Sequence, residues 1–117
     1  DDMNVLYPLV RGADILIYST PVYWWGVSGQ LKIFLDRLHA LDHVVFSGKH
    51  LVVLATGSDE VNGVQYKLIQ QQFQEICTYL SMEFVGYLPI SADDEHRVSD
   101  NPSALEAAKL LASSMNT

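Results

Sequence analysis

Three aromatic side chains, Tyr23, Trp24 and Trp25, stand side by side in a short segment that follows an apolar run. The segment, residues 19–29, reads STPVYWWGVSG. Its proline stiffens the exit from the run, and its first glycine allows the backbone to approach a ligand closely. It leads into a helix whose N-terminus, at Ser28, offers free N–H groups and a positive dipole end that favour electron-rich groups. A flat, conjugated ligand with hydrogen-bonding edges would match this combination of aromatic rings and free N–H groups.

The elements around this segment alternate between helices and strands. Apolar runs such as ILIY at 15–18 are continuous, which is typical of strands covered on both faces in a parallel sheet. Alternation of this kind predicts right-handed βαβ units. The expected helices cover residues 3–11, 28–41, 64–80 and 103–113, and the expected strands cover 13–19, 50–55 and 84–90. Ligands bind beyond the carboxyl ends of such strands, which selects the loops 19–28, 56–63 and 91–101.

Local signals predict how the helices begin and which faces they bury. Ser28 and either Asn101 or Ser103 are expected N-caps, while Asp2 or Asn4 is expected to cap the first helix, with Pro8 delaying its start. The helix over 64–80 is expected to bury a stripe of apolar residues that includes Cys77: Leu68, Ile69, Phe73, Ile76, Cys77 and Leu80.

The length of the chain and its alternating elements predict one α/β domain over residues 1–117, and its composition excludes several classes of partner. The chain is 49% hydrophobic, which is enough for a core. A net charge of -7 argues against a nucleic acid or an anionic membrane surface as a partner. No apolar run approaches the roughly 20 residues of a membrane span. A single cysteine excludes an intrachain disulfide and fits a reducing compartment, so we expect a cytoplasmic protein.

Other polar residues are better explained without a catalytic role. Lys32 and Asp36 are four apart on a helix and are expected to form a surface ion pair. His39 and His43 have a spacing that suits a metal, but no further ligand is evident, so we expect no metal site. The charged run at 93–97 lies at the correct end of the sheet for a substrate contact, yet a solvated loop is the favoured interpretation.

The segment TPVYWWGVSGQLKIFLDR resembles the stretch after the third strand of flavodoxin-like NAD(P)H-dependent FMN reductases, which are related to the iron–sulfur flavoproteins. ADILIYST before it and the ATG loop after the next strand follow the family's order. The resemblance implies a flavodoxin-like parallel sheet with helices on both faces, in the order 2-1-3-4-5. The three strands expected here correspond to the third, fourth and fifth of that sheet.

The resemblance also implies a cofactor, a reaction and a site. It places FMN against the backbone amides of the first loop, with the ring of Tyr23 or Trp24 beside the flavin, and against the second loop. NAD(P)H as co-substrate is implied to give a hydride to flavin N5, and a quinone, flavin or other small acceptor then takes the electrons. No catalytic acid or base is expected. The implied cofactor-binding residues are Thr20, Pro21, Val22, Tyr23, Trp24, Thr56, Gly57 and Ser58.

The family's first strand, phosphate-binding loop, first helix and second strand have no counterpart in this sequence. We therefore expect an N-terminally incomplete flavodoxin-like domain that lacks the anchor for the FMN phosphate. The strand at 13–19 is expected to have an unpaired edge, and this edge predicts a homo-oligomer or poor solubility. Two other functions remain open, namely a non-catalytic binding or assembly module and a flavodoxin-type electron carrier. The three aromatic rings can also be explained as a cover over the core.

Overall fold

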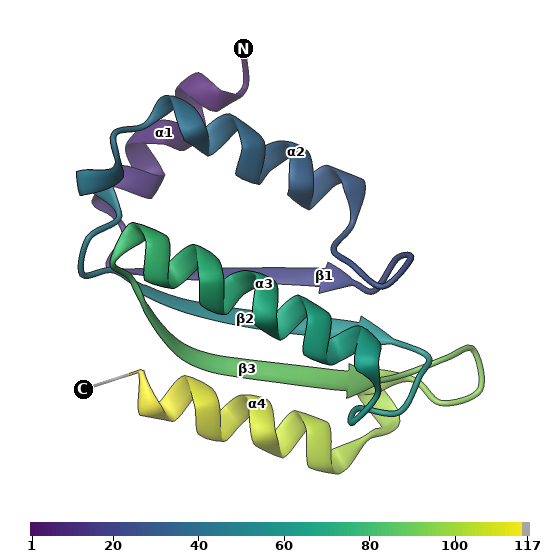
Figure 1. The fold of residues 1–117 in the computed structure, drawn as a ribbon. Helices are drawn as coiled ribbons and strands as arrows, with labels where there is room; N and C mark the ends of the chain where they lie inside the picture. Colours follow the sequence, from purple (N-terminus) through teal and green to yellow (C-terminus); the bar gives the residue numbers. More distant parts are fainter. Residues whose placement is uncertain (116–117) are drawn as a thin grey trace.

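A computed structural model describes residues 1–115 and shows a three-stranded parallel sheet in the order β1-β2-β3 (Figure 1). Each strand is followed by a helix, as the alternation of elements predicts. The strands are β1 (Ile15–Pro21), β2 (His50–Gly57) and β3 (Glu83–Ser91). The helices are α1 (Met3–Gly12), α2 (Gly29–Arg37), α3 (Val64–Leu80) and α4 (Pro102–Ser114), with short 3₁₀ turns at Leu38–Ala40, His43–Val45 and Val98–Asp100.

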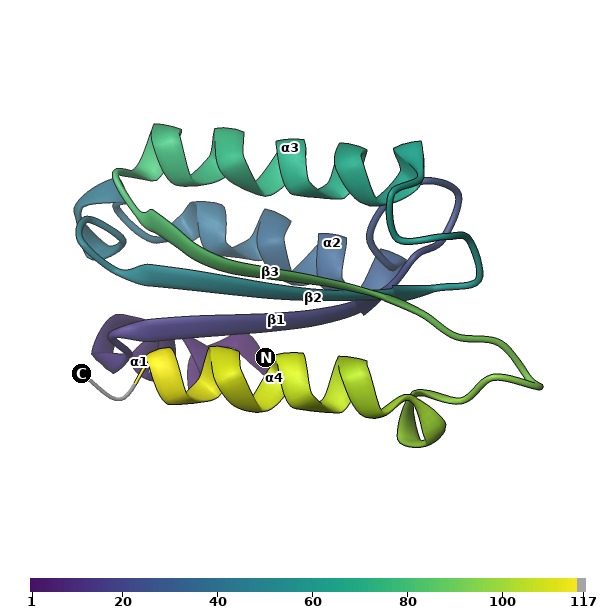
Figure 2. The same cartoon turned by 90° about the horizontal axis from the view of Figure 1, so that it is seen from below.

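The helices form layers on both sides of the sheet. Helices α2 and α3 lie on one face and α4 lies on the other, beneath β3 (Figure 2). Helix α4 can approach β3 closely because the strand has a glycine, Gly86, at the point of contact. A Cβ atom at Gly86 would lie 2.5 Å from Cδ1 of Leu111 on α4. Helix α1 lies beyond the edge of β1 (Figure 1), where the hydroxyl of Tyr7 donates to the carbonyl of Arg37, the last residue of α2, at 2.9 Å.

The main core lies between the sheet and the layer that contains α3. Helix α3 spans the predicted residues 64–80 and fully buries Ile69 and Phe73. Cys77 is buried, as predicted. Leu68, however, is 50% exposed, and the sequence-based stripe was wrong there because Tyr66 occupies the inward position at that end of the helix. The core residues are Met3, Val10, Leu16, Leu38, Leu41, Phe46, Leu51, Val53, Ala55, Tyr66, Ile69, Phe73 and Cys77.

The first helix begins at the first residue of its predicted range, and Pro8 does not delay its start as expected. Helix α1 begins at Met3 and contains Pro8, because the carboxylate of Asp1 accepts a hydrogen bond from the Met3 amide at 2.9 Å and satisfies the first turn. Pro8 then costs one intrahelical hydrogen bond without ending the helix. Asp2 occupies the N-cap position, which was one of the two predictions, although its side chain makes no capping hydrogen bond. Asn4 lies inside the helix, so the alternative prediction was wrong.

Two other boundaries differ from the predicted ones. Helix α2 ends at Arg37, and the chain continues as a 3₁₀ turn, so the predicted helix to residue 41 is too long. Strand β1 begins at Ile15, two residues later than predicted, and extends to Pro21. The expectation that both faces of β1 are covered is wrong, because Ile17 is 54% exposed.

Strand β1 forms one edge of the sheet and, within residues 1–115, pairs only with β2. An edge strand presents unpaired N–H and C=O groups that can pair with another chain. Association through this edge stays a prediction. No helix in the described part of the chain has both the length and the apolar character needed to cross a bilayer.

Candidate functional site

The first and second candidate loops meet at the carboxyl ends of β1 and β2. Pro21 lies opposite Thr56 in the parallel ladder, and the amide of Val22 donates to the carbonyl of Thr56 at 2.8 Å. Gly57 makes this contact possible, because a Cβ atom there would lie 3.0 Å from the Cβ of Val22. The structure thus brings together both groups of residues that the sequence selects, 20–24 and 56–58.

The side chain of Thr20 forms hydrogen bonds inside the protein and does not line the surface of the candidate site. Its side chain is almost fully buried, and its hydroxyl accepts a hydrogen bond from the amide of Ser28 at 2.9 Å. The same hydroxyl donates to the carbonyl of Pro21 at 2.8 Å. Ser28 in turn caps α2 by accepting from the amide of Leu31 at 3.2 Å, as predicted. Thr20 therefore ties the start of the first loop to its end.

Between these two ends the loop forms a tight hairpin. The amide of Tyr23 donates to the carbonyl of Gly26 at 2.9 Å, and the amide of Gly26 donates back to Tyr23 at 3.0 Å. The two central residues, Trp24 and Trp25, have φ angles of 48° and 65°. Positive φ at both central positions is the signature of a type I′ turn, which favours Asn-Gly. Left-handed backbone costs a residue with a Cβ atom roughly 1–2 kcal/mol.

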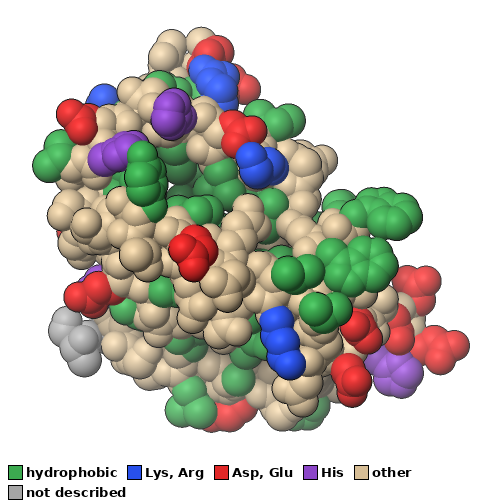
Figure 3. Space-filling model, in the orientation of Figure 1, with side chains coloured by type: hydrophobic (Ala, Val, Ile, Leu, Met, Phe, Trp, Pro, Cys, Tyr) green, Lys and Arg blue, Asp and Glu red, His purple; other side chains and the backbone are tan. Residues whose placement is uncertain are grey.

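The hairpin also holds its aromatic rings in the open. Trp24 is 92% exposed, so it does not cover the core, while Tyr23 and Trp25 are 58% and 49% exposed. Hydrophobic side chains gather at this end of the sheet, with acidic side chains nearby (Figure 3). Within residues 1–115, the amides of Trp24, Trp25 and Val27 donate no hydrogen bond. Three N–H groups are thus free to face a ligand.

A buried tyrosine that the sequence analysis missed fixes the second loop. The hydroxyl of Tyr66 lies 2.9 Å from the carbonyl of Ile90 and 3.2 Å from that of Asp59. Burial raises the pKa of Tyr66, although the backbone N–H of Gly57 beside the hydroxyl partly offsets the effect. Tyr66 precedes Ile69 by three residues, so helical spacing was the signal that could have identified it as inward-facing.

We expect Tyr66→Phe to loosen the loop at 56–63. The substitution keeps the ring but leaves carbonyl groups near the hydroxyl without their buried partner, which costs about 1–3 kcal/mol of unfolding free energy. Urea unfolding measures this loss, and hydrogen exchange at residues 57–61 measures the loosening. The matched control is Tyr79→Phe on the same helix, because Tyr79 is 69% exposed. Equal stability of the two variants would contradict the role assigned to Tyr66.

In the third candidate loop, one carboxylate is bound by groups of the loop itself. The carboxylate of Asp93 accepts hydrogen bonds from the amides of His96 at 2.7 Å and Glu95 at 2.9 Å, and it lies 2.9 Å from the imidazole of His96. These contacts, led by the His96 amide, lower the pKa of Asp93. Residues 93–97 are exposed, in keeping with a solvated loop.

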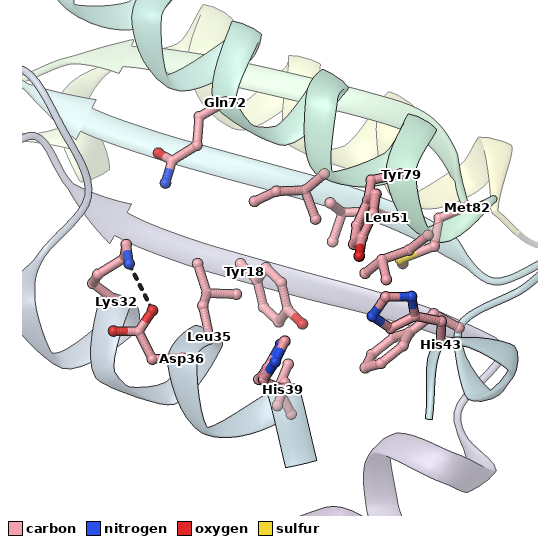
Figure 4. A pocket seen from close by; sticks show the side chains of 14 residues that line it. Tyr18, Lys32, Leu35, Asp36, His39, His43, Leu51, Gln72, Tyr79 and Met82 are labelled. Carbon is pink, nitrogen blue, oxygen red and sulfur yellow. Dashed lines mark hydrogen bonds and ion pairs between the residues drawn. The ribbon is translucent and has the colours of Figure 1, made fainter. Parts of the chain in front are cut away.

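A separate cavity of about 240 Å³ lies between α2 and α3, over the sheet (Figure 4). Its floor includes the ring of Tyr18, and burial raises the pKa of Tyr18 to about 12, so its hydroxyl is neutral at pH 7. At the rim, Lys32 and Asp36 form the predicted ion pair at 2.6 Å. No residue of the loops 19–28 or 56–63 lines this cavity. It is therefore distinct from the site at the carboxyl edge.

The two histidines near this cavity pack as aromatic rings. The centroids of His39 and His43 are 6.5 Å apart, and the ring of His43 lies edge-on to Tyr79 at 4.8 Å. No group of three or more potential metal ligands occurs among residues 1–115.

Comparisons with known proteins point to one family. Residues 1–96 match the family model described as NADPH-dependent FMN reductase. A Bacillus subtilis protein, YwqN, which is named as an NAD(P)H-dependent FMN-containing oxidoreductase, is 34% identical over 119 residues, covering 95% of this chain and 65% of the relative. An iron–sulfur flavoprotein of Archaeoglobus fulgidus is 35% identical over 94 residues, covering 78% of this chain and 45% of the relative.

Solved structures agree in fold. The structure described as the Trp repressor binding protein from Bacillus subtilis superposes with a TM-score of 0.85 at 32% identity. The alignment covers 95% of this chain and 72% of that one. The chain spans a smaller share of the two relatives compared by sequence, namely 65% of the length of YwqN and 45% of the length of the iron–sulfur flavoprotein.

Proposed function

Because the chain belongs to the NADPH-dependent FMN reductase family and has the flavodoxin-like α/β fold, we propose that it supports FMN-dependent oxidoreduction with NAD(P)H as the hydride donor. When bound, FMN supplies the redox chemistry, because it takes up a hydride equivalent from the nicotinamide and passes electrons to an acceptor. The chain's own task is to bind and orient the flavin. The proposed acceptor is a small molecule.

The contact between the two loops carries this proposal. The Val22–Thr56 hydrogen bond and the absence of a side chain on Gly57 allow these two loops to lie side by side. We propose that the flavin ring lies against Val22 and Tyr23 on one side and against 56–58 on the other. Pro21 and buried Thr20 hold the first loop in shape, and the free amide of Trp24 is available to a flavin oxygen or nitrogen.

The residues present fit the ring of FMN better than its phosphate. A flavin ring needs N–H donors and aromatic or apolar faces, and the hairpin offers both. Neither the loop at 19–28 nor the loop at 56–63 contains a lysine or arginine. The ring therefore supplies most of the affinity that these two loops can give.

The test is anaerobic reduction of FMN by NADPH, and separately by NADH, in the presence of the protein. We expect the visible flavin absorbance to disappear at least roughly tenfold faster than with free FMN, since orientation of donor and acceptor alone accelerates such a step. Heat-unfolded protein is the control. A rate equal to that of free FMN with both nicotinamides would contradict the proposal.

The acidic composition favours one second candidate, a flavodoxin-type electron carrier. The net charge of -7 suits docking to a basic redox partner. The same assay separates the two functions, because a carrier binds FMN without accelerating its reduction by NAD(P)H.

A further inference from the structure

The cavity between α2 and α3 is large enough to hold a small organic molecule. Its volume is about 240 Å³. An apolar protein cavity of roughly 150 Å³ takes up benzene, so this one has room for a molecule of two fused rings. Apolar side chains from both helices, from the turns after α2 and from β2 form much of its wall: Leu35, Leu38, Phe46, Leu51, Ile76 and Leu80.

Aromatic rings surround the opening of this cavity. The imidazoles of His39 and His43 have centroids 6.5 Å apart, and His43 lies edge-on to the ring of Tyr79 at 4.8 Å. These three side chains line the cavity together with the ring of Tyr18 on β1 (Figure 4). Tilted and edge-on rings of this kind pack favourably against a further aromatic ring. The cavity therefore suits a flat aromatic molecule.

The hydroxyl of Tyr18 gives the floor of the cavity a hydrogen-bonding group. Figure 4 shows the tyrosine ring projecting from β1 into the space between α2 and α3. Burial, followed by the nearby Cys77 thiol, raises the pKa of Tyr18 to about 12, and no hydrogen bond within residues 1–115 contributes to the shift. The hydroxyl is therefore neutral at pH 7 and can both donate to and accept from a ligand hydroxyl.

The charges at the rim favour a neutral ligand. Lys32 and Asp36 line the opening and compensate each other as an ion pair at 2.6 Å. Among the residues that the structure describes, no other lysine, arginine or carboxylate lines the cavity. The chain as a whole carries a net charge of -7, and such a field repels anions. An aromatic alcohol is thus favoured over an aromatic carboxylate of the same size.

We propose that the cavity between α2 and α3 binds a neutral phenol of one or two rings, whose hydroxyl forms a hydrogen bond with that of Tyr18. The rings of the ligand lie against the aromatic side chains at the opening. No residue of the loops 19–28 or 56–63 lines this cavity, so the phenol and a flavin bind at the same time. The assignment goes beyond the proposed function and does not depend on it.

The probe is 2-naphthol, which is neutral at pH 7, has two fused rings and carries one hydroxyl. We expect isothermal titration calorimetry to give one site per chain with a Kd of roughly 0.1 mM, as is common for so small a ligand. The anion 2-naphthoate is expected to bind at least roughly tenfold more weakly. Tyr18→Phe keeps the ring and removes the hydroxyl, so we expect the affinity for 2-naphthol to fall roughly threefold to tenfold.

Ile76→Trp tests the location of the site. The larger side chain occupies the cavity, so saturable binding of 2-naphthol is expected to disappear while the thermal midpoint is kept or raised. Ile33→Trp is the matched control, because Ile33 lies on α2, is 65% exposed and does not line the cavity. If Ile76→Trp does not fold, amide chemical shifts of the unchanged protein locate the ligand, with changes expected at 35–39 and 76–82 but not at 20–27.

Four results would overturn the assignment. They are the absence of saturable binding up to about 1 mM 2-naphthol, equal affinity for 2-naphthoate, an affinity that Tyr18→Phe leaves unchanged, and displacement of 2-naphthol by FMN. A dimer that Ile76→Trp disrupts and Ile33→Trp preserves would also overturn it, because a second copy of the chain would then occupy the cavity. Failure to accelerate FMN reduction would remove the proposed function and leave this site in place.

Discussion

Replacement of Gly57 by valine is expected to weaken FMN binding at least roughly tenfold and to lower the unfolding free energy by about 1–3 kcal/mol. The first atom of the new side chain would lie 3.0 Å from both the Cβ of Val22 and the hydroxyl oxygen of Tyr66. Neither neighbour is the free end of a flexible chain, because Val22 is bonded to Thr56 through its backbone and Tyr66 is fully buried. The two loops must therefore move apart.

Gly12→Val is the matched control for this substitution. A Cβ atom at Gly12 meets no other atom within 4 Å, so the same change of residue introduces no clash there. Flavin fluorescence measures the affinity, and urea unfolding measures the stability. If Gly57→Val bound FMN as tightly as Gly12→Val, the close approach of the loops would have no part in the site.

Replacement of Phe73 by alanine is expected to cost about 3–5 kcal/mol of unfolding free energy, the largest effect on stability of any change considered. Phe73 is completely buried in the middle of α3, and its ring centroid lies 6.0 Å from that of Tyr18 on β1. The cavity left behind lies between the helix and the strand that carries the first ligand loop. A domain of this size has only a modest total stability, so the variant would be partly unfolded at 37 °C.

Leu68→Ala is the control for Phe73→Ala. Leu68 lies on the same helix but is 50% exposed, so its truncation removes less buried surface. Chemical unfolding with circular dichroism detection gives both values. A cost for Phe73→Ala no larger than that for Leu68→Ala would contradict the assignment of Phe73 to the centre of the core.

Periodicity predicted much of the fold because the main elements are decided locally. The bounds of α3 were predicted without error, since its apolar positions recur at helical spacing over the whole length of 64–80. The parallel order followed from the alternation of strands and helices, and the cap of α2 followed from Ser28. The exposure of Ile17 was not predictable in this way, because it depends on which elements lie over β1.

The loops that form the candidate site were predicted, but their internal structure was not. The turn at Trp24 and Trp25 runs against the preferences of its residues, and sequence reasoning therefore gave no reason to expect a type I′ hairpin. The buried roles of Thr20 and Tyr66 depend on partners seven or more residues away, such as Ser28 and Ile90. Such contacts become visible only when the elements are placed in space.

The most direct test of the central claim, that the loops at 20–24 and 56–58 hold the flavin ring, is a titration of FMN against the protein followed by flavin fluorescence. The account predicts saturable quenching with one FMN per chain, and loss of binding in Gly57→Val but not in Gly12→Val. It also predicts an affinity for riboflavin within about threefold of that for FMN, because these loops carry no basic residue. Flavin that stays as fluorescent as free FMN at saturating protein, or binding that is insensitive to Gly57→Val, would contradict it.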